Sequence, residues 1–496
     1  MFLKLQEIIN SKRFLLLMIS VFLLPFFVLS FWNHPSTDDF NIGILDKSLS
    51  FSQIQSFYYF HWSGRYTYGA LATWAASGGF LYHHYWIFAA LFLLLTFFSF
   101  LFTIVQVTKY LLQNKCSIVE MTIVAALLLV LELHVIPEIK TQFYWFTSAL
   151  TYQAPLIFLV LMCGFLIRLF CDKKGTAFNF SIVLILDCLA NGFNEMTSFV
   201  ILVIATILLI MHLYFNASRK LIPLLLYGCN LIFFCVMMFS PGMWHRESGY
   251  PARSFLVNTA VSVANFIAVN WTFLKDPLWW FMCIIVALWS VQHQGLYKSK
   301  AVQWLQRLSF SKLIVLYLLT GLLIFIPIFI GAHGSLPLRA QNVPCFLLAL
   351  SVLLLVHFKF SSGAYQPFTM QQGNYIQRYR WVLFSVLIFT TTVTAELVQS
   401  IISGYFYQGV MQEREARLFN ADKRTTIYID EFDLALKKKM KETFPKKVPV
   451  TLDRMIKQKP VLLFVEDYLD QDSIIKYVYG VDNLIINRDS MPKNKQ

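Results

Sequence analysis

Charged residues are scarce in this chain of 496 residues. Asp, Glu, Lys and Arg make up 14% of it, whereas 57% of the residues are hydrophobic and the mean hydropathy is +0.59. Ordinary soluble domains carry about a quarter charged residues, so the composition excludes a soluble globular protein. It predicts an α-helical polytopic membrane protein.

Acidic residues are the scarcer of the two signs. The chain has 27 Asp and Glu against 41 Lys and Arg, which leaves a formal net charge of +14. In a soluble chain this excess would suggest nucleic acid. Here the basic residues fall mainly in short connections and in the tail, as they do when they orient a membrane protein. We therefore expect membrane lipids, and no nucleic acid, among its partners.

Cysteine pairs with metal-site spacing are absent as well. All cysteines lie in or beside apolar segments, namely Cys116, Cys163, Cys171, Cys188, Cys229, Cys235, Cys283 and Cys345. This placement predicts neither structural disulfides nor a cysteine-bound metal. No internal repeat is evident, which disfavours a transporter built from inverted repeats.

About eleven apolar runs reach or approach the roughly 20 residues that a membrane crossing requires. They cover 14–32, 87–108, 118–136, 151–170, 180–190, 196–215, 221–239, 279–293, 313–331, 343–358 and 381–402. The first run follows Lys4, Lys12 and Arg13 and lacks a small-residue cleavage site. It therefore reads as an uncleaved first span rather than a signal peptide.

Basic residues orient these spans. With a cytoplasmic N-terminus, the connections that carry the following residues all stay inside: Lys109, Lys115, Arg168, Lys173, Lys174, Arg219, Lys220, Lys298, Lys300, Arg307, Lys312, Lys359, Arg378 and Arg380. The two long connections 33–86 and 240–278 then lie outside. We thus expect a membrane module over 1–402, with its site on the outer face of a bacterial inner membrane.

Residues 403–496 differ in composition from the rest of the chain. They are rich in Lys, Asp and Glu, and their pattern predicts a small extracytoplasmic α/β domain over 426–429, 432–440, 461–465, 473–479 and 484–486. Its acidic group consists of Glu466, Asp467, Asp470 and Asp472. This group leaves a divalent cation possible, but it lacks the spacing and turn glycine of a calcium loop, which favours a solvated turn.

Asp38 and Asp39 follow the first span directly, in the stretch His34–Phe40. Adjacent carboxylates at a membrane exit suggest a reacting group, in a chain otherwise poor in acid. The alternative is that Ser36 or Thr37 caps a helix whose first turn holds both acids. The other outer connections also carry polar clusters, and this favours the interpretation of Asp38 and Asp39 as reacting groups over the capping interpretation.

Two aromatic clusters lie in these connections. The first runs from Tyr58 through Trp62 to Arg65 and Tyr66, after an amphipathic stretch over 51–57. Arg65 could contact lipid headgroups or hold one of the two acids. The second cluster contains Glu138, Lys140, Trp145, Tyr152 and Gln153. It would suit sugar hydroxyls lying over an aromatic face, although an ordinary interfacial loop is the better explanation for any single one of these residues.

Three further positions are polar at the outer ends of spans. The turn Asn194–Glu195 places a carboxylate between apolar runs. Ser240-Pro241-Gly242 predicts a turn that delivers His245 and Arg246 into the second long connection. Arg339 precedes a late span. Arg246 and Arg339 offer the planar, permanently charged groups that bind phosphate well.

In their order along the chain, these motifs resemble a branch of the bacterial GT-C class of polyprenyl-phosphate-sugar glycosyltransferases. The matching motifs are Asp38-Asp39-Phe40, Trp62 to Tyr66, Asn194-Glu195, Pro241-Gly242 with Arg246, and Pro337-Leu338-Arg339, with Tyr477-Val478-Tyr479-Gly480 in place of a tail Tyr-Tyr-Gly signature. The resemblance extends over nearly the whole chain.

This resemblance implies an inverting transferase that moves a sugar from a polyprenyl-phosphate donor to an extracytoplasmic glycan or lipid acceptor. Asp38 or Asp39 would be the general base, and Arg246 and Arg339, with His245 nearby, would hold the leaving phosphate. Which acid reacts is left open. An O-antigen-type polymerase or ligase, a transporter of lipid-linked saccharides and a non-enzymatic scaffold are the alternatives.

Overall fold

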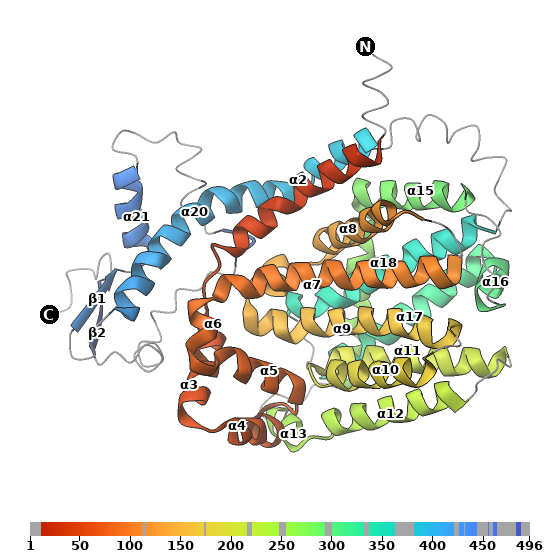
Figure 1. Cartoon of the computed structure of the whole chain (residues 1–496), viewed down its shortest axis with the longest axis horizontal. Helices are drawn as coiled ribbons and strands as arrows, with labels where there is room; N and C mark the ends of the chain where they lie inside the picture. The colour runs from red at the N-terminus through yellow and green to blue at the C-terminus, as the bar shows by residue number, and fades with distance from the viewer. Residues whose placement is uncertain are drawn as a thin grey trace, which may run out of the picture.

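The fold is almost entirely helical. The computed structural model describes residues 11–112, 116–172, 175–215, 221–247, 254–292, 300–331, 337–362, 381–420, 426–430, 432–443, 455, 460–463 and 483–487. Most helices run in roughly the same direction and form one bundle (Figure 1). A compact group of shorter helices covers one end of this bundle.

Eight described helices are long and apolar enough to cross a membrane. They are α2 (Lys12–Ser30), α7 (Tyr85–Gln106), α8 (Ile118–Val135), α9 (Phe146–Cys171), α11 (Glu195–Tyr214), α12 (Leu221–Met238), α14 (Phe255–Lys275) and α18 (Leu338–Phe360). Caps define several starts: Ser117 and Glu120 form a capping box at α8, and Asn194 accepts from the Thr197 N–H at α11.

Further apolar helices complete the bundle. They are α10 (Thr176–Asn191), α15 (Pro277–Gln292) and α17 (Phe310–Gly331), together with a pair bent by 54°, Trp381–Phe389 and α20 (Thr392–Phe419). Two short helical segments lie in the connections: the π-helical segment η3 (Val107–Leu112) and the α-helix α16 (Lys300–Arg307). The eleven predicted spans all coincide with helices: seven with helices named in the preceding paragraph and four with those named here. Helix α14 is the one described span-length helix that was not predicted as a span. The chain is therefore a multi-pass α-helical membrane protein.

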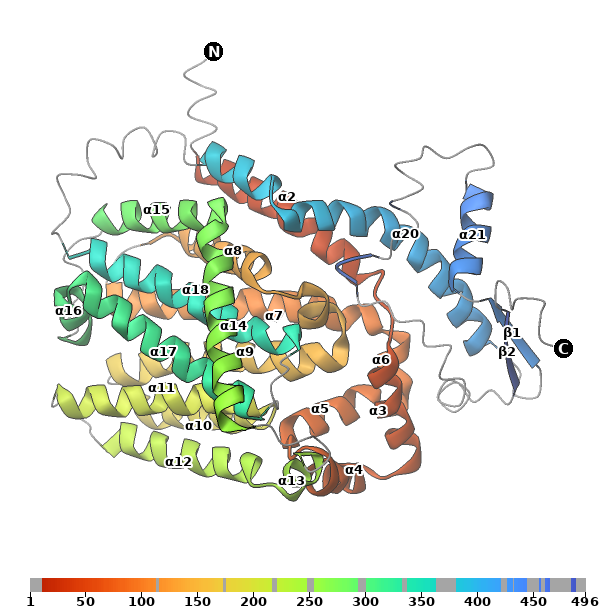
Figure 2. The same cartoon turned by 180° about the vertical axis from the view of Figure 1, so that it is seen from behind.

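Residues 240–278 differ from the prediction of a long connection. They contain α13 (Pro241–Glu247) and the span-length helix α14. Of the eight long helices α14 is the least apolar, because Asn258, Asn265 and Asn270 interrupt it. The amides of Asn265 and Asn270 donate to carbonyls one turn earlier, which makes them compatible with a helix. In Figure 2, α14 runs across α17 rather than alongside it, and the two helices pack together.

The predicted turn at Pro241–Gly242 is also different, because α13 begins there. Proline suits the first position of a helix, where its missing N–H costs nothing. A Cβ on Gly242 would meet the carbonyl oxygen of Tyr59 at 2.8 Å and the Ser63 nitrogen at 2.9 Å. Glycine is thus required here for α13 to pack against η1 (Tyr58–Trp62), a short helix of the first long connection.

The first long connection forms a layer of short helices. It contains α3 (Thr37–Ser48), α4 (Phe51–Phe57), η1 (Tyr58–Trp62), α5 (Tyr66–Ala76), η2 (Ser77–Gly79) and α6 (Phe80–His83). The helix α4 coincides with the predicted amphipathic stretch. Figure 1 shows the layer at the end of the bundle where α2 stops and α7 begins.

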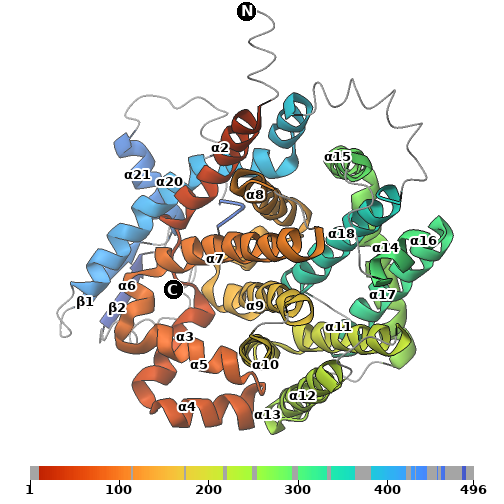
Figure 3. The same cartoon turned by 45° about the vertical axis from the view of Figure 1, so that its right-hand side comes forward.

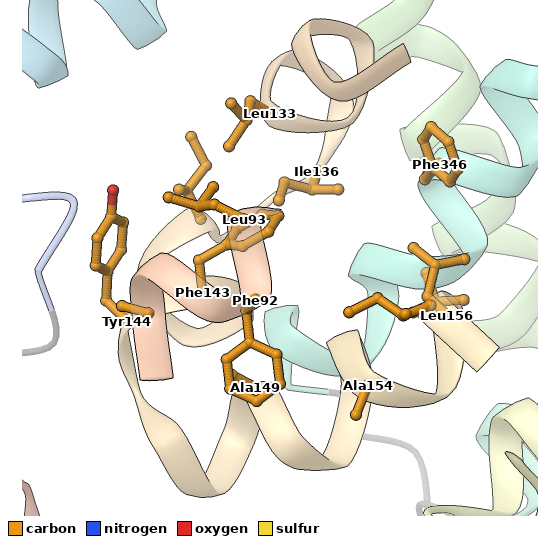
Figure 4. Packing of buried hydrophobic residues seen from close by; sticks show 14 of the residues in the cluster. Phe92, Leu93, Leu133, Ile136, Phe143, Tyr144, Ala149, Ala154, Leu156 and Phe346 are labelled. Carbon is orange, nitrogen blue, oxygen red and sulfur yellow. The ribbon is translucent and has the colours of Figure 1, made fainter. Parts of the chain in front are cut away.

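Beneath this layer, the core is formed where α7, α8, α9 and α18 meet. Phe92 and Leu93 of α7, Leu133 of α8, Leu156 of α9 and Phe346 of α18 are all buried, and they gather at this junction in Figure 4. The π-helical turn η4 (Lys140–Tyr144) lies in the same core and contributes Phe143 and Tyr144. The core holds η4, and the residues that follow it, in a fixed place.

The tail is attached to the bundle by a continuous helix. Helix α20 runs through residue 402, the predicted boundary, without a break. Beyond it, β1 (Thr426–Asp430) and β2 (Asn483–Asn487) pair in parallel, with Thr426 opposite Asn483. Helix α21 (Phe432–Thr443) packs against α20. Residues 464–480, with the acidic group and the Tyr477–Gly480 motif, lie outside the described residues.

A contact between His34 and Glu415 places the tail at the end of the bundle that carries the α3–α6 layer. His34 Nδ1 lies 2.7 Å from Glu415 Oε1 of α20, and α20 packs beside α2 (Figure 3). The described start of the tail and the α3–α6 layer therefore lie at the same end of the bundle. This arrangement requires an odd number of crossings before Glu415, which eleven spans satisfy if the crosswise α14 is not a crossing.

Single-cysteine variants test this arrangement. In a background with the other native cysteines replaced, we expect Ser56→Cys and Asn420→Cys to react with an impermeant maleimide from the same side of the membrane. The native Cys171, at the far end of α9, should react only from the other side. Labelling of Ser56→Cys and Asn420→Cys from opposite sides would contradict the structure.

Candidate active site

A cavity of about 440 Å³ lies between the α3–α5 layer and the ends of α9 and α18. This volume is within the usual range for small-molecule sites, about 300–1,000 Å³. Its lining comprises Asp38, Asn41, Ile42, Ile44, Leu45, Phe57, Tyr58, Trp62, Arg65, Tyr68, Trp145, Thr147, Ser148, Thr151, Tyr152 and Arg339. Five of these were predicted site residues: Asp38, Trp62, Arg65, Tyr152 and Arg339.

The two neighbouring acids are separated by the helix that carries them. Asp38 is half-buried and lines the cavity, whereas Asp39 is fully buried and does not line it. Successive residues of a helix point about 100° apart, which explains why only one of the pair reaches the cavity. Asp38 is therefore the carboxylate that is placed to meet a bound molecule.

Asp39 is held by four donors. Its Oδ2 accepts from the Ser36 N–H at 2.9 Å and from the Tyr85 hydroxyl at 2.6 Å. Its Oδ1 accepts from the Thr147 N–H at 3.0 Å and from the Thr147 hydroxyl at 2.5 Å. Ser36 and Asp39 form a capping box on α3, as the capping interpretation predicted. Through Tyr85 and Thr147, the same carboxylate also joins α3 to α7 and α9.

Asp39 lies at the N-terminal turns of both α3 and α9. The positive end of each helix dipole favours a negative charge there. Burial has the opposite effect and is the larger one, so it raises the pKa of Asp39 to about 6 despite the hydrogen bonds from Thr147, Tyr85 and Ser36. Near neutral pH this carboxyl is ionised and can accept all four hydrogen bonds.

Arg65 forms a bidentate ion pair with Glu195. Its Nε lies 3.0 Å from Glu195 Oε1 and its Nη2 lies 2.8 Å from Oε2. Burial disfavours the charged guanidinium, but Glu195 more than offsets this and holds the pKa of Arg65 above its ordinary value. Asn194 supports the pair by capping α11 and donating to the Thr151 carbonyl. Arg65 therefore enters the cavity with its charge already balanced.

Arg339 enters the cavity from the first turn of α18. Its guanidinium carbon lies 5.0 Å from the centre of the Trp145 ring, the geometry of a cation–π contact. No acidic side chain among the described residues pairs with Arg339. The contact leaves the donors at the edge of the guanidinium plane available, which suits it to an anionic ligand.

Asn342 fixes the position of Arg339 from one turn further along α18. Its Oδ1 accepts from the Glu138 N–H at 3.0 Å, and its Nδ2 donates to the Glu138 carbonyl and to Gln142 Oε1, both at 2.9 Å. Asn342 is fully buried. These bonds hold the start of α18, which carries Arg339, against η4, which Trp145 directly follows.

The first turns of α9 bring several hydroxyl groups to the cavity wall: Thr147, Ser148, Thr151 and Tyr152. Of these, only Tyr152 was predicted as a site residue. Ser148 is 3% exposed, and its Oγ has no hydrogen-bond partner within the described part of the chain. A run of hydroxyl side chains at the start of a predicted span was the signal that could have identified this wall.

The other predicted site residues lie outside the cavity lining. Glu138 and Lys140 pair with each other at 3.4 Å. Asn194 and Glu195 stand behind the wall, and His245 is exposed on α13. The Arg246 side chain is outside the described part of the chain. No group of His, Cys, Asp and Glu with metal-binding geometry occurs among the described residues.

Comparisons with known proteins returned no relative. No protein-family model matches the chain, and neither the curated proteins nor the solved structures that were searched contain a match. The chemistry of this cavity is therefore the basis for assigning a function.

Removal of Asp39 tests its structural role. We expect Asp39→Ala to lower stability by about 1–3 kcal/mol, because it leaves buried donors of Ser36, Tyr85 and Thr147 without an acceptor. The matched variant Asp38→Ala should unfold close to the wild-type temperature. Thermal unfolding of the purified proteins measures both, and equal losses would contradict the assignment.

The pH dependence of the protein's stability tests the role of Asp39 independently. A carboxyl whose pKa is raised on folding stabilises the protein most at low pH, and that contribution is lost as pH rises from its ordinary pKa, 3.8, through about 6. We expect Asp39→Ala to remove this part of the stability–pH profile and Asp38→Ala to retain it.

Proposed function

We propose that the chain is an inverting membrane glycosyltransferase that takes a sugar from a polyprenyl-phosphate donor. The observation that carries the proposal is that one cavity brings together a carboxylate, Asp38, and an arginine without an acidic partner among the described residues, Arg339. A general base and a phosphate-binding cation are the two groups that this transfer needs.

In the proposed reaction, Asp38 accepts the proton of an acceptor hydroxyl. The hydroxyl oxygen forms a bond to the anomeric carbon, while the bond from that carbon to the phosphate oxygen breaks and its electron pair stays with the phosphate. Attack from the face opposite the leaving group inverts the anomeric centre. Polyprenyl phosphate and a glycosylated acceptor are the products.

Arg339 stabilises the charge that develops on the leaving phosphate. The phosphodiester of the donor carries one negative charge, and the released phosphate monoester carries more. A cation whose interaction strengthens as this charge grows lowers the barrier rather than merely binding the donor. Trp145 and Asn342 position the guanidinium before the substrate arrives, so little reorganisation is needed during the reaction.

The basic connections support an outward-facing site. Among the described basic residues, Lys109, Arg168 and Lys359 lie at helix ends away from the α3–α6 layer, which supports an extracytoplasmic position for the cavity and the tail. This orientation fits a transferase of the bacterial inner membrane that acts on a cell-envelope glycan or lipid. In the tail, β1, α21 and β2 would belong to a small α/β domain beside the site.

The alternatives account less well for the cavity. A polymerase or ligase of the O-antigen type has no need of Asp38. A transporter would bind its cargo near the middle of the membrane. Two buried acids, Glu132 of α8 and Asp187 of α10, do lie inside spans. Neither lines the large cavity, and Asp187 is bonded to Asn191 and Asn230.

Asp38→Asn is the direct test of the transferase. Asparagine keeps the size of the side chain but cannot accept the proton, so we expect the transfer rate to fall by about 10²- to 10⁴-fold. The measurement is incorporation of labelled sugar from a polyprenyl-phosphate donor into native membranes that contain the protein. Glu138→Gln, which alters a carboxylate outside the cavity, is the control and should retain wild-type activity.

Loss of activity together with normal thermal unfolding supports a catalytic role for Asp38. Full activity of Asp38→Asn would refute the assignment of the base.

A further inference from the structure

We infer that the transferred sugar is neutral, neither a uronic acid nor an amino sugar. The inference rests on the proposed function and concerns the part of the same cavity that lies between Asp38 and Arg339. It follows from which charged side chains line that region and from what the transfer itself requires of them.

The balanced charge is that of Arg65. Both oxygens of Glu195 are engaged by its guanidinium, and the two side chains are only 14% and 21% exposed. An ion pair that is largely removed from water keeps its partners, because separating them leaves a buried charge uncompensated. A sugar carboxylate that reached the remaining N–H donors of Arg65 would therefore meet a guanidinium whose charge is already balanced, and it would lie close to the Glu195 carboxylate.

Arg65 lies in the part of the cavity that a sugar would occupy. Burial raises the pKa of Tyr68, and among the charges that act on its hydroxyl are Asp38, which raises that pKa, and Arg65, which lowers it. Tyr152 lines the same cavity as Arg65 and, after Glu195, contributes to holding the pKa of Arg65 above its ordinary value. The base and the Arg65–Glu195 pair thus share one neighbourhood, while Arg339 and Trp145 mark the phosphate end.

The other two charged side chains that line the cavity, Arg339 and Asp38, each have a role in the proposed transfer. Arg339 offsets the phosphodiester, and Asp38 must stay available to accept a proton. Among the described side chains that line the cavity, no further cation is left for a sugar carboxylate and no further acid is left for a sugar amine. An acidic sugar would also lie beside Asp38, and repulsion between two carboxylates is unfavourable.

The wall between these two ends offers groups that suit sugar hydroxyls. Ser148, Thr151 and Tyr152 follow one another along one side of α9, and Trp62 and Tyr58 add aromatic surface to the cavity lining. Hydroxyl and aromatic groups recognise neutral sugars through hydrogen bonds and stacking without contributing charge. The composition of the wall agrees with the charge balance.

Binding of matched donors tests the inference without an identified acceptor. Dissociation constants of the full-length protein in nanodiscs are measured for polyprenyl-phosphate glucose, for polyprenyl-phosphate glucuronic acid and for polyprenyl phosphate alone. We expect glucose to bind at least tenfold more tightly than glucuronic acid. In Glu195→Gln, Arg65 loses its balancing charge, and the preference should shrink at least tenfold or reverse.

Glu138→Gln is the matched control, because it removes a paired carboxylate that does not line the cavity, and its preference should equal that of the wild type. Equal affinities of the wild-type protein for the two sugars would overturn the inference, and so would an unchanged preference in folded Glu195→Gln. Failure of all three lipids to bind would instead refute the proposed function, so the two failures are distinguishable.

Discussion

The buried carboxylate of Asp39 is the constraint on which the site depends. It lies at the starts of α3 and α9 and accepts hydrogen bonds from Ser36, Tyr85 and Thr147. A charge is costly to bury, and several donors together with two helix N-termini make it tolerable. The result is that α3, in the layer of short helices, is fixed to the two long helices α7 and α9. Because Asp38 immediately precedes Asp39 on α3, the same bonds fix the direction in which Asp38 enters the cavity.

Neutral polar contacts provide the corresponding constraint on the opposite wall. Asn342 bonds to the Glu138 peptide and to Gln142, and so ties the start of α18 to η4. Amide hydrogen bonds are directional, and buried ones are expensive to break. Arg339 and Trp145 lie one turn away from these bonds. The two walls therefore present a carboxylate and a guanidinium at set positions before any substrate binds, which is the preorganisation that charge-stabilising catalysis requires.

The spans were predictable from the sequence because apolar runs of sufficient length have few other fates. The helix α14 was missed because its asparagines lower its hydropathy, although two of them bond to their own helix and leave it intact. The sequence also singled out Asp38, Arg65 and Arg339, which line one cavity in the structure, but it could not show that Asp38 reaches that cavity while Asp39 is buried. Burial of Asp39 depends on Thr147, which is far away in the sequence. The pairing of Arg65 with Glu195 is a tertiary contact of the same kind.

A structure of the protein with polyprenyl-phosphate glucose bound is the most direct test of the proposed site. The account predicts that the phosphate contacts the Arg339 guanidinium beside Trp145, with the sugar along α9 and its anomeric carbon facing Asp38. A donor bound elsewhere would contradict it. The clearest contradiction would be a donor bound at the smaller apolar cavity of α10–α12, which Asp187 and Asn230 line, while the cavity beside Asp38 stays empty.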